Sequence, residues 1–364
     1  MASTLASLCL QAIFENFSTS NEEAEGEYSS FKDYEKKASS QIHNNKIYNN
    51  RRQLLYFALV NRHWCDNAIP YLWKRPFPLL SGISFISTLL RCFENDNHPR
   101  PLFQYNLFIK KLSLESFMEA IVRWSKSSQQ RKSGKVPIPN ILKSLFHHLI
   151  NSKTNFYLEL EYEDNIVSSL YEYKNWSIFQ IPNAKESLRQ LRYLKISSAQ
   201  DIRLLESASK ICLDLSVLTI ISDNLLNREH SHQCELFSYF NSFQNLKFLR
   251  LDCGQYASRF YCDNFIIELA RKLPKTLDTL IIEGDLKIST HALRQFLHRS
   301  RGSRFKLLGF PHSKSISDAH LDVILEVVKY SYTDIGIQRL NVSNAILSQN
   351  QVWKFASQGI ELIS

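Results

Sequence analysis

The sequence predicts an α/β protein in which a small N-terminal helical module precedes a solenoid, with a curved parallel sheet inside and helices outside. The main observation is a short unit, apolar at its first, fourth and sixth positions, that recurs along the chain from residue 109. Its copies begin at Ile109, Leu191, Leu215, Leu246, Leu277 and Ile337, and weaker copies contain Leu158-Glu-Leu160 and Leu308-Gly-Phe310. The second observation is that segments with helical periodicity lie between these copies.

The spacing of the later copies is nearly constant. The fourth positions from Leu218 to Leu340 follow one another at intervals of 28 to 32 residues. Side chains two residues apart in a strand point to the same face, so the fourth and sixth positions predict a buried strand face. The first position is expected to anchor the turn that enters the strand. A nearly constant period predicts one structural unit repeated along the chain.

Three segments between the later copies have apolar residues at helical spacing: Asp263–Leu273, Thr290–Leu297 and Asp318–Val328. Thr290 and Asp318 are expected to be N-caps, because their side chains can accept the free N–H groups of a first helical turn. A strand and a helix repeated at a fixed period form a solenoid, in which each unit needs its neighbours to bury its apolar face. An ordinary α/β domain remains the alternative, and the regular spacing favours the repeat.

The N-terminal part of the chain carries a different pattern. Apolar residues recur at helical spacing from Tyr56 to Trp64, which predicts a short helix with one apolar face. Pro70 lacks an N–H group and restricts the residue before it, so this helix is not expected to continue through it. A second tryptophan, Trp73, follows soon after. Because so short a segment cannot bury two tryptophans by itself, it needs a partner surface.

The stretch Leu55–Phe77, LYFALVNRHWCDNAIPYLWKRPF, resembles the second half of an F-box in its fungal form, LVNR-x-WC followed by (I/V)P-x-LW and PF. Residues 5–17 resemble the opening F-box helix, because their apolar residues follow the i, i+3, i+4, i+7 rule of one helix face. The chain departs from the family at Ala6, where the family has proline, and at Leu8, where it has an acidic residue.

The resemblance implies an F-box protein with C-terminal leucine-rich repeats of the irregular kind, the substrate receptor of a cullin-RING ubiquitin ligase of the SCF type. Its F-box would dock on a Skp-type adaptor and through it on a cullin. Its repeats would hold an unknown protein substrate, so the chain would act by proximity and would not itself be an enzyme. Pro70 would set a turn and Trp73 would be an aromatic anchor. The implied adaptor-binding residues are Leu5, Leu10, Ile13, Phe14, Phe17, Leu59, Val60, Trp64, Pro70, Leu72 and Trp73.

The expected organisation is an F-box-like module over residues 1–77, a linker helix region over 78–108 and a repeat domain over 109–364. A polar insertion over residues 18–52, rich in Glu, Ser, Asn and Lys, is expected to be a mobile loop. Residues that alternate with the buried ones would line a concave strand face that binds substrate, although each also fits a solvated sheet face. They are Lys111, Glu115, Glu159, Glu161, Lys195, Arg250, Asp252, Glu283 and Asn341.

Composition narrows the partners and the compartment. The formal charge of +9 raises nucleic acid as a partner, but the densest basic run, Lys126–Lys135, has no interleaved aromatic residues and is expected to be a solvated loop. No run of 18 apolar residues occurs, so no membrane span is expected, and no basic region precedes the first apolar residues to suggest a signal peptide. Seven cysteines without a CxxC pair fit the reducing cytoplasm or nucleus.

Catalytic and cofactor motifs are missing from the sequence. It has no Walker loop, GxGxxG, GxSxG or HExxH. His230-Ser-His232-Gln-Cys234 offers three possible metal ligands, but a structural zinc needs four and no nearby motif supplies the fourth. We therefore expect no enzyme activity, no metal and no cofactor.

One further alternative is a repeat protein whose F-box-like helices only cap the end of the solenoid and have no ligase role. A cap would bury Leu10, Phe14 and Trp73 against the repeats. A docking module would instead leave an apolar patch exposed.

Overall fold

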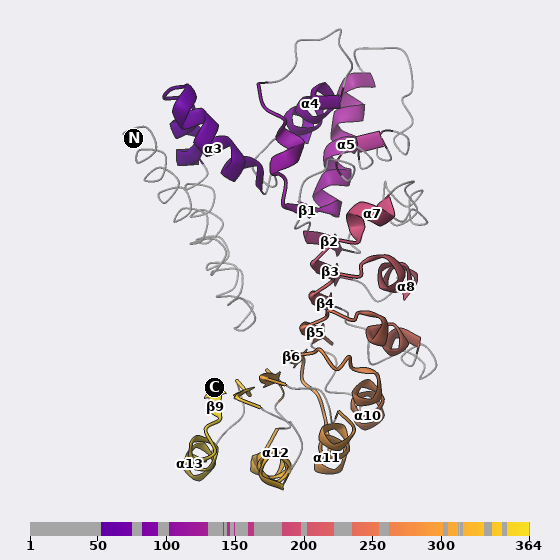
Figure 1. The fold of residues 1–364 in the computed structure, drawn as a ribbon, viewed down its shortest axis with the longest axis vertical. Helices are drawn as coiled ribbons and strands as arrows, with labels where there is room; N and C mark the ends of the chain where they lie inside the picture. Colours follow the sequence, from indigo (N-terminus) through magenta and orange to yellow (C-terminus); the bar gives the residue numbers. More distant parts are fainter. Residues whose placement is uncertain are drawn as a thin grey trace. The chain divides into compact units, whose positions relative to one another are not determined.

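The computed structural model describes most of the chain from residue 52 onward (Figure 1). The described residues are 52–74, 82–93, 102–129, 141, 144–145, 149, 159–163, 184–197, 202–221, 235–254, 262–300, 305–311, 313, 316–330, 337–343 and 348–363. The chain divides into two compact units, Met1–Thr154 and Asn155–Ser364.

The first unit is mainly helical. After a helical turn over residues 52–58, its elements are α3 (Arg62–Lys74), α4 (Gly82–Phe93), the 3-10 turn η1 (Tyr105–Phe108), β1 (Lys111–Ser113) and α5 (Leu114–Gln129). Among the described residues, its core is an aromatic cluster. The Trp73 ring lies 4.3 Å from Tyr105 and 5.3 Å from Phe85, and Phe85 meets Phe117 of α5 edge to face at 6.2 Å.

The chain between Tyr56 and Trp73 differs from the prediction at two points. The predicted helix from Tyr56 to Trp64 is interrupted by a turn at residues 59–61, where the side chain of Asn61 accepts the backbone N–H of Trp64 at 3.0 Å and starts a new helix. That helix, α3, runs through Pro70 to Lys74, so the expectation that Pro70 ends the helix and sets a turn is wrong. Packing of the buried Leu72 and Trp73 holds the last turn in place and offsets the hydrogen bond that proline removes.

The prediction for Glu115 is also wrong. Glu115 was expected on a strand face, but β1 ends at Ser113 and Glu115 lies in α5, which begins at Leu114. The apolar residues Phe117, Ala120 and Ile121 recur at helical spacing and are buried, so a helix buries this segment better than a longer strand would. Within the first unit α4 packs on α5, and the indole Nε1 of Trp124 donates to Ser87 Oγ at 3.1 Å.

The second unit alternates strands and helices. Its strands are β2 (Glu159–Glu163), β3 (Tyr193–Ser197), β4 (Val217–Ile221), β5 (Phe248–Asp252), β6 (Thr279–Glu283), β7 (Leu307–Gly309), β8 (Arg339–Asn341) and β9 (Glu361–Ile363). Its helices are α7 (Ala184–Leu188), α8 (Ile202–Ile211), the 3-10 turn η4 (Phe240–Ser242), α10 (Asp263–Lys272), α11 (Thr290–Arg299), α12 (Asp318–Tyr330) and α13 (Gln349–Ser357). Each strand from β2 to β9 pairs in parallel with the next strand in sequence.

The helices of the second unit cover one face of its sheet. Figure 1 shows α8, α10, α11, α12 and α13 on the outer side of a curved row of strands. This arrangement agrees with the predicted α/β protein with a parallel sheet, and it is consistent with a curved repeat solenoid. The described residues therefore place one strand face against the helices and leave the opposite face as the candidate binding surface.

The apolar pattern of the sequence forms the core between the sheet and the helices. In register, the fourth positions stack from strand to strand, and every one of them is at most 1% exposed. They are Leu194, Leu218, Leu249, Leu280, Leu308 and Leu340. The predicted turn anchors, such as Leu215, Leu246 and Leu277, are fully buried as well. Removing such side chains from water is the main stabilising term of a repeat array.

The N-cap of α11 lies one residue before the position expected from sequence, and Asp318 is not an N-cap. Ser289, and not Thr290, caps α11, because its Oγ accepts the N–H of Ala292 at 3.1 Å. Asp318 is the first residue of α12 and lies inside its first turn. Ser289 also donates from its backbone N–H and its Oγ to the Asp263 carboxylate of α10, at 2.8 and 2.6 Å, so the cap links two neighbouring repeat units.

Candidate functional site

Part of the predicted adaptor surface lies outside the described residues. This applies to Leu5, Leu10, Ile13, Phe14 and Phe17, and the weak metal candidate over residues 230–234 is outside them too. The described members of the predicted set are Leu59, Val60, Trp64, Pro70, Leu72 and Trp73.

Four apolar side chains around the turn at residues 59–61 are exposed. We call them the Leu59 surface: Leu55, Tyr56, Leu59 and Val60. Leu59 is 74% exposed and Val60 is 61% exposed, while about half of each of the other two is exposed. The helical turn over residues 52–58 buries its opposite side through Leu54 and Ala58. Exposed apolar groups that lie together on a folded unit commonly mark a contact surface for a partner.

The remaining described members of the predicted adaptor set are more enclosed. Trp73 is 6% exposed, and its neighbours Phe85 and Tyr105 belong to the same unit. Leu72 is buried beside it, Pro70 is half-buried inside α3, and the half-buried Trp64 packs on the Phe57 ring at 5.1 Å. The Trp73 side chain is therefore buried within the first unit, whereas the side chains of Leu59 and Val60 are exposed to solvent.

The second candidate surface is the strand face opposite the helices, which we call the open strand face. Two predicted residues on it, Arg250 and Glu283, bind each other across neighbouring strands. Arg250 Nε donates to Glu283 Oε2 at 2.9 Å, and an Arg250 terminal nitrogen contacts the same oxygen. Glu283 is 6% exposed although it is charged, so this pair replaces much of the water that its carboxylate would otherwise bind.

Other polar residues of the open strand face form local contacts. Asp252 Oδ1 accepts the N–H of Gly254 at 3.0 Å, which favours the tight turn where Gly254 adopts a φ of 70°. Asn341 Oδ1 accepts the Ser343 N–H at 3.2 Å and its hydroxyl at 3.1 Å. The charges at Arg250, Asp252 and Glu283 are therefore largely satisfied within the protein.

The register shows which predicted residues lie in one row. Lys195 of β3, Arg250 of β5 and Asn341 of β8 occupy the same row of the sheet, separated by residues of the intervening strands. Glu161 of β2 pairs with Lys195, whereas Glu159 lies in the neighbouring row with Tyr193. Lys111 lies on β1, which belongs to the first unit.

Sequence reasoning missed the apolar residues of the open strand face. Tyr193, Val217, Phe248 and Leu307 are half-buried members of one row, which also contains Thr279. The alternation of strand residues could have revealed them. Each comes directly before a buried leucine, so its side chain points to the opposite face of the sheet. The open strand face therefore combines an apolar row with a polar row.

Three buried cysteines of the described residues are not activated as nucleophiles. Burial raises the pKa of the Cys212 thiol to about 12 and that of Cys262 to about 11, and it raises the pKa of Cys253 strongly. Thiols with such pKa values stay protonated near neutral pH and react slowly. The described residues also hold no group of His, Cys, Asp or Glu side chains able to bind a metal ion, and none of their helices is long and apolar enough to span a membrane.

Comparison with solved structures finds distant structural similarities to this chain. No family model matches the chain, and no curated protein matches it. The crystal structure of a Bacteroides fragilis protein, a structural genomics target, aligns with 60% of this chain and 69% of its own chain. The aligned residues are 14% identical and the TM-score is 0.36.

Proposed function

We propose that this chain is the substrate-recognition subunit of an SCF-type ubiquitin ligase, with an N-terminal F-box and a C-terminal leucine-rich-repeat domain. The F-box docks on a Skp-type adaptor, which connects it to a cullin. The repeats hold a protein substrate, and the chain acts in the cytoplasm or nucleus. It makes and breaks no covalent bond, and its contribution to rate is the proximity of substrate lysines to the conjugating enzyme.

The Leu59 surface is the observation that carries the adaptor half of this proposal. It lies within the stretch whose sequence resembles an F-box, and it is exposed while the same unit buries Trp73 in a core of its own. A helical cap of the solenoid would use Trp73 against the repeats. Instead, Trp73 packs on Phe85 and Tyr105 of the first unit, which favours a docking module over a cap.

The parallel sheet with its open strand face supports the second half of the proposal, that the repeats bind a protein substrate. Repeat proteins use extended surfaces of this kind to bind other proteins. The apolar row from Tyr193 to Leu307 offers contact area, and polar residues beside it, such as Lys195 and Asn341, offer hydrogen bonds. This combination suits a protein segment better than a nucleic acid, because it has no continuous positive charge for phosphates.

A binding assay with purified Skp-type adaptor tests the proposal. We expect the intact chain to bind, and we expect the double variant Leu59→Asp, Val60→Asp to bind at least about tenfold more weakly, because charges replace apolar contact residues. Leu102→Asp is the matched control, since Leu102 is 64% exposed in the same unit but outside the Leu59 surface. A second variant, Leu10→Asp with Phe14→Asp, tests the predicted opening helix.

Thermal unfolding of each variant shows whether lost binding is a folding defect. Equal loss of binding in Leu102→Asp would mean that the effect is not specific to the Leu59 surface. No binding by a well-folded intact chain would exclude the receptor role and leave a repeat protein whose F-box-like helices serve another purpose.

A further inference from the structure

A pocket of about 490 Å³ lies in the second unit, away from the open strand face, where three chain segments meet. Asn241 belongs to η4, and Gln244 to the loop between η4 and β5. The end of α10 contributes Arg271, and the loop before β6 contributes Lys275 and Thr276. Arg299 and Ser300 come from the end of α11. The pocket is built by two successive repeat units and the segment before them, so it depends on their stacking.

The charge of the pocket lining is one-sided. Arg271, Lys275 and Arg299 line it, and no carboxylate is among its lining residues. Arg271 forms an ion pair with Glu268 at 2.5 Å, outside the lining. Within the described part of the chain, no hydrogen bond or ion pair occupies the side chains of Lys275 and Arg299.

The negative ends of the helix dipoles offset only part of the positive charge of the pocket. Arg271 and Arg299 lie in the last turns of α10 and α11, where a cation offsets about half a negative charge at each helix end. Lys275 lies in the loop after α10, beyond the helix end. The positive charge of the three cations is larger than the combined negative charge of the two helix ends and the Glu268 carboxylate. The pocket therefore remains positively charged.

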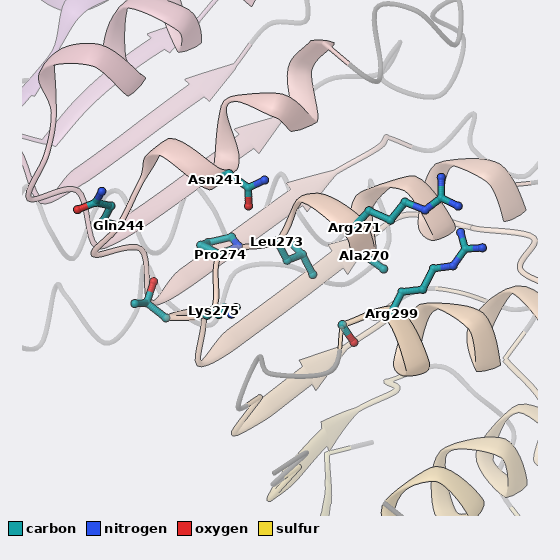
Figure 2. A pocket seen from close by; sticks show the side chains of 10 residues that line it. Asn241, Gln244, Ala270, Arg271, Leu273, Pro274, Lys275 and Arg299 are labelled. Carbon is teal, nitrogen blue, oxygen red and sulfur yellow. The ribbon is translucent and has the colours of Figure 1, made fainter. Parts of the chain in front are cut away.

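The positions of the side chains indicate the kind of anion. Figure 2 shows Arg271 and Arg299 extending in the same direction at one end of the pocket, while Gln244 and Lys275 lie toward the other end. Both guanidinium groups belong to the pocket lining, and Arg271 also pairs with Glu268, so Arg299 brings the positive charge at this end that no carboxylate of the described residues offsets. The planar N–H groups of the guanidiniums match the oxygens of a phosphoryl group, which can accept two parallel hydrogen bonds from each.

We propose that this pocket binds phosphoryl groups, with Arg271 and Arg299 holding one group and Lys275 placed for a second. The Asn241 and Gln244 amides add neutral donors to the lining. The volume exceeds that of one phosphoryl group, so the pocket also has room for the atoms that carry it. The source is either a free oligophosphate or a phosphorylated side chain of a protein. The proposal does not depend on the ligase role.

Calorimetric titration of the full chain tests this site with three probes at constant ionic strength: inorganic phosphate, tripolyphosphate and N-acetyl-phosphoserine amide. We expect saturable binding of tripolyphosphate or of the phosphoserine compound, and the tighter of the two identifies the source. Arg299→Ala should weaken binding of every probe about tenfold or more, because a charge-assisted contact is lost. Lys275→Ala should weaken tripolyphosphate more than it weakens inorganic phosphate.

Lys272→Ala is the matched control. Lys272 is the neighbour of Arg271 in the last turn of α10 and carries the same charge, but it does not line the pocket. It should change binding by less than about twofold. Equal weakening by Lys272→Ala and Arg299→Ala would reduce the effect to general charge attraction, and the absence of saturable binding to the intact, folded chain would overturn the proposal.

Discussion

Arg250 and Glu283 form a charged pair on the open strand face with one partner almost fully buried. Side-chain exposure is 25% for Arg250 and 8% for Glu283, and the two residues come from neighbouring strands. A buried carboxylate is tolerated when a cation and other donors replace its water. The pair therefore stabilises the join between β5 and β6 and leaves little charge for a partner to use.

Arg250→Ala should lower the free energy of unfolding by about 2–4 kcal/mol, because it leaves the buried Glu283 carboxylate without its guanidinium partner. Urea unfolding monitored by circular dichroism measures this change. Arg339→Ala is the control: Arg339 pairs with Glu361 at 2.7 Å, but both side chains are more than half exposed, so its loss should cost at most about 1 kcal/mol. Equal losses for the two variants would contradict the assigned role of burial.

The burial of Cys212 makes the stability of the protein depend on pH. Burial raises the pKa of its thiol to about 12, above its ordinary value of about 8.5. The native state therefore keeps this proton when the unfolded state has lost it. The resulting stabilisation is fully present below about pH 8.5 and is lost as the pH rises toward 12.

At pH 10, the intact chain should have lost about 2 kcal/mol of stability through Cys212 relative to neutral pH. Cys212→Ala removes this contribution but keeps the titration of all other groups. The stability difference between the two proteins, measured by urea unfolding, should therefore shrink or reverse between pH 7.5 and pH 10. An unchanged difference would show that the thiol does not titrate as its burial implies.

The N-cap of α11 contacts two helices. Ser289 Oγ accepts the Ala292 N–H and also donates to the Asp263 carboxylate of α10, so one side chain serves two helices. Ser289→Ala should lower the free energy of unfolding by about 1–2 kcal/mol. Ser348 caps α13 through a longer contact of 3.4 Å to the Gln351 N–H, and Ser348→Ala should cost less. Thermal or urea unfolding compares the two, and a larger loss for Ser348→Ala would contradict this ranking.

The same elements show what the sequence could predict. Strands such as β5 and β6 follow from the alternation of buried and open residues, and α10, α11 and α12 follow from their apolar periodicity. Local side-chain contacts explain why two of the predictions were wrong. Asn61 supplies a cap that breaks the predicted helix, and packing of Trp73 carries α3 through Pro70. Both effects depend on side-chain contacts that periodicity does not record.

The candidate surfaces were predictable to different degrees. The open strand face was expected, but its apolar row was missed because residues such as Val217 and Phe248 are indistinguishable by type from core residues. The sequence contains no motif for the phosphoryl pocket. Asn241, Arg271 and Arg299 are far apart in sequence and line one pocket only when the repeat units stack. Sites built from loops of successive repeats need the register before they can be recognised.

The chain divides into two compact units, and each buries core residues of its own. In the first unit Phe85 is fully buried and packs against Trp73 and Phe117, and in the second unit Leu249 is fully buried in the middle of the stacked leucine row. In a repeat array each unit is stabilised mainly by its nearest neighbours. A core substitution should therefore weaken its own unit first.

Leu249→Ala should destabilise the second unit by about 3 kcal/mol, since it removes a fully buried leucine and leaves a cavity. Hydrogen exchange should then quicken in β4, β5 and β6 and remain unchanged in α4 and α5. Phe85→Ala is the reciprocal variant and should quicken exchange in α4 and α5 without affecting β4 to β6. If each variant accelerated exchange in both units alike, the two units would unfold as one cooperative body, and an adaptor-binding module could not open or close independently of the repeats.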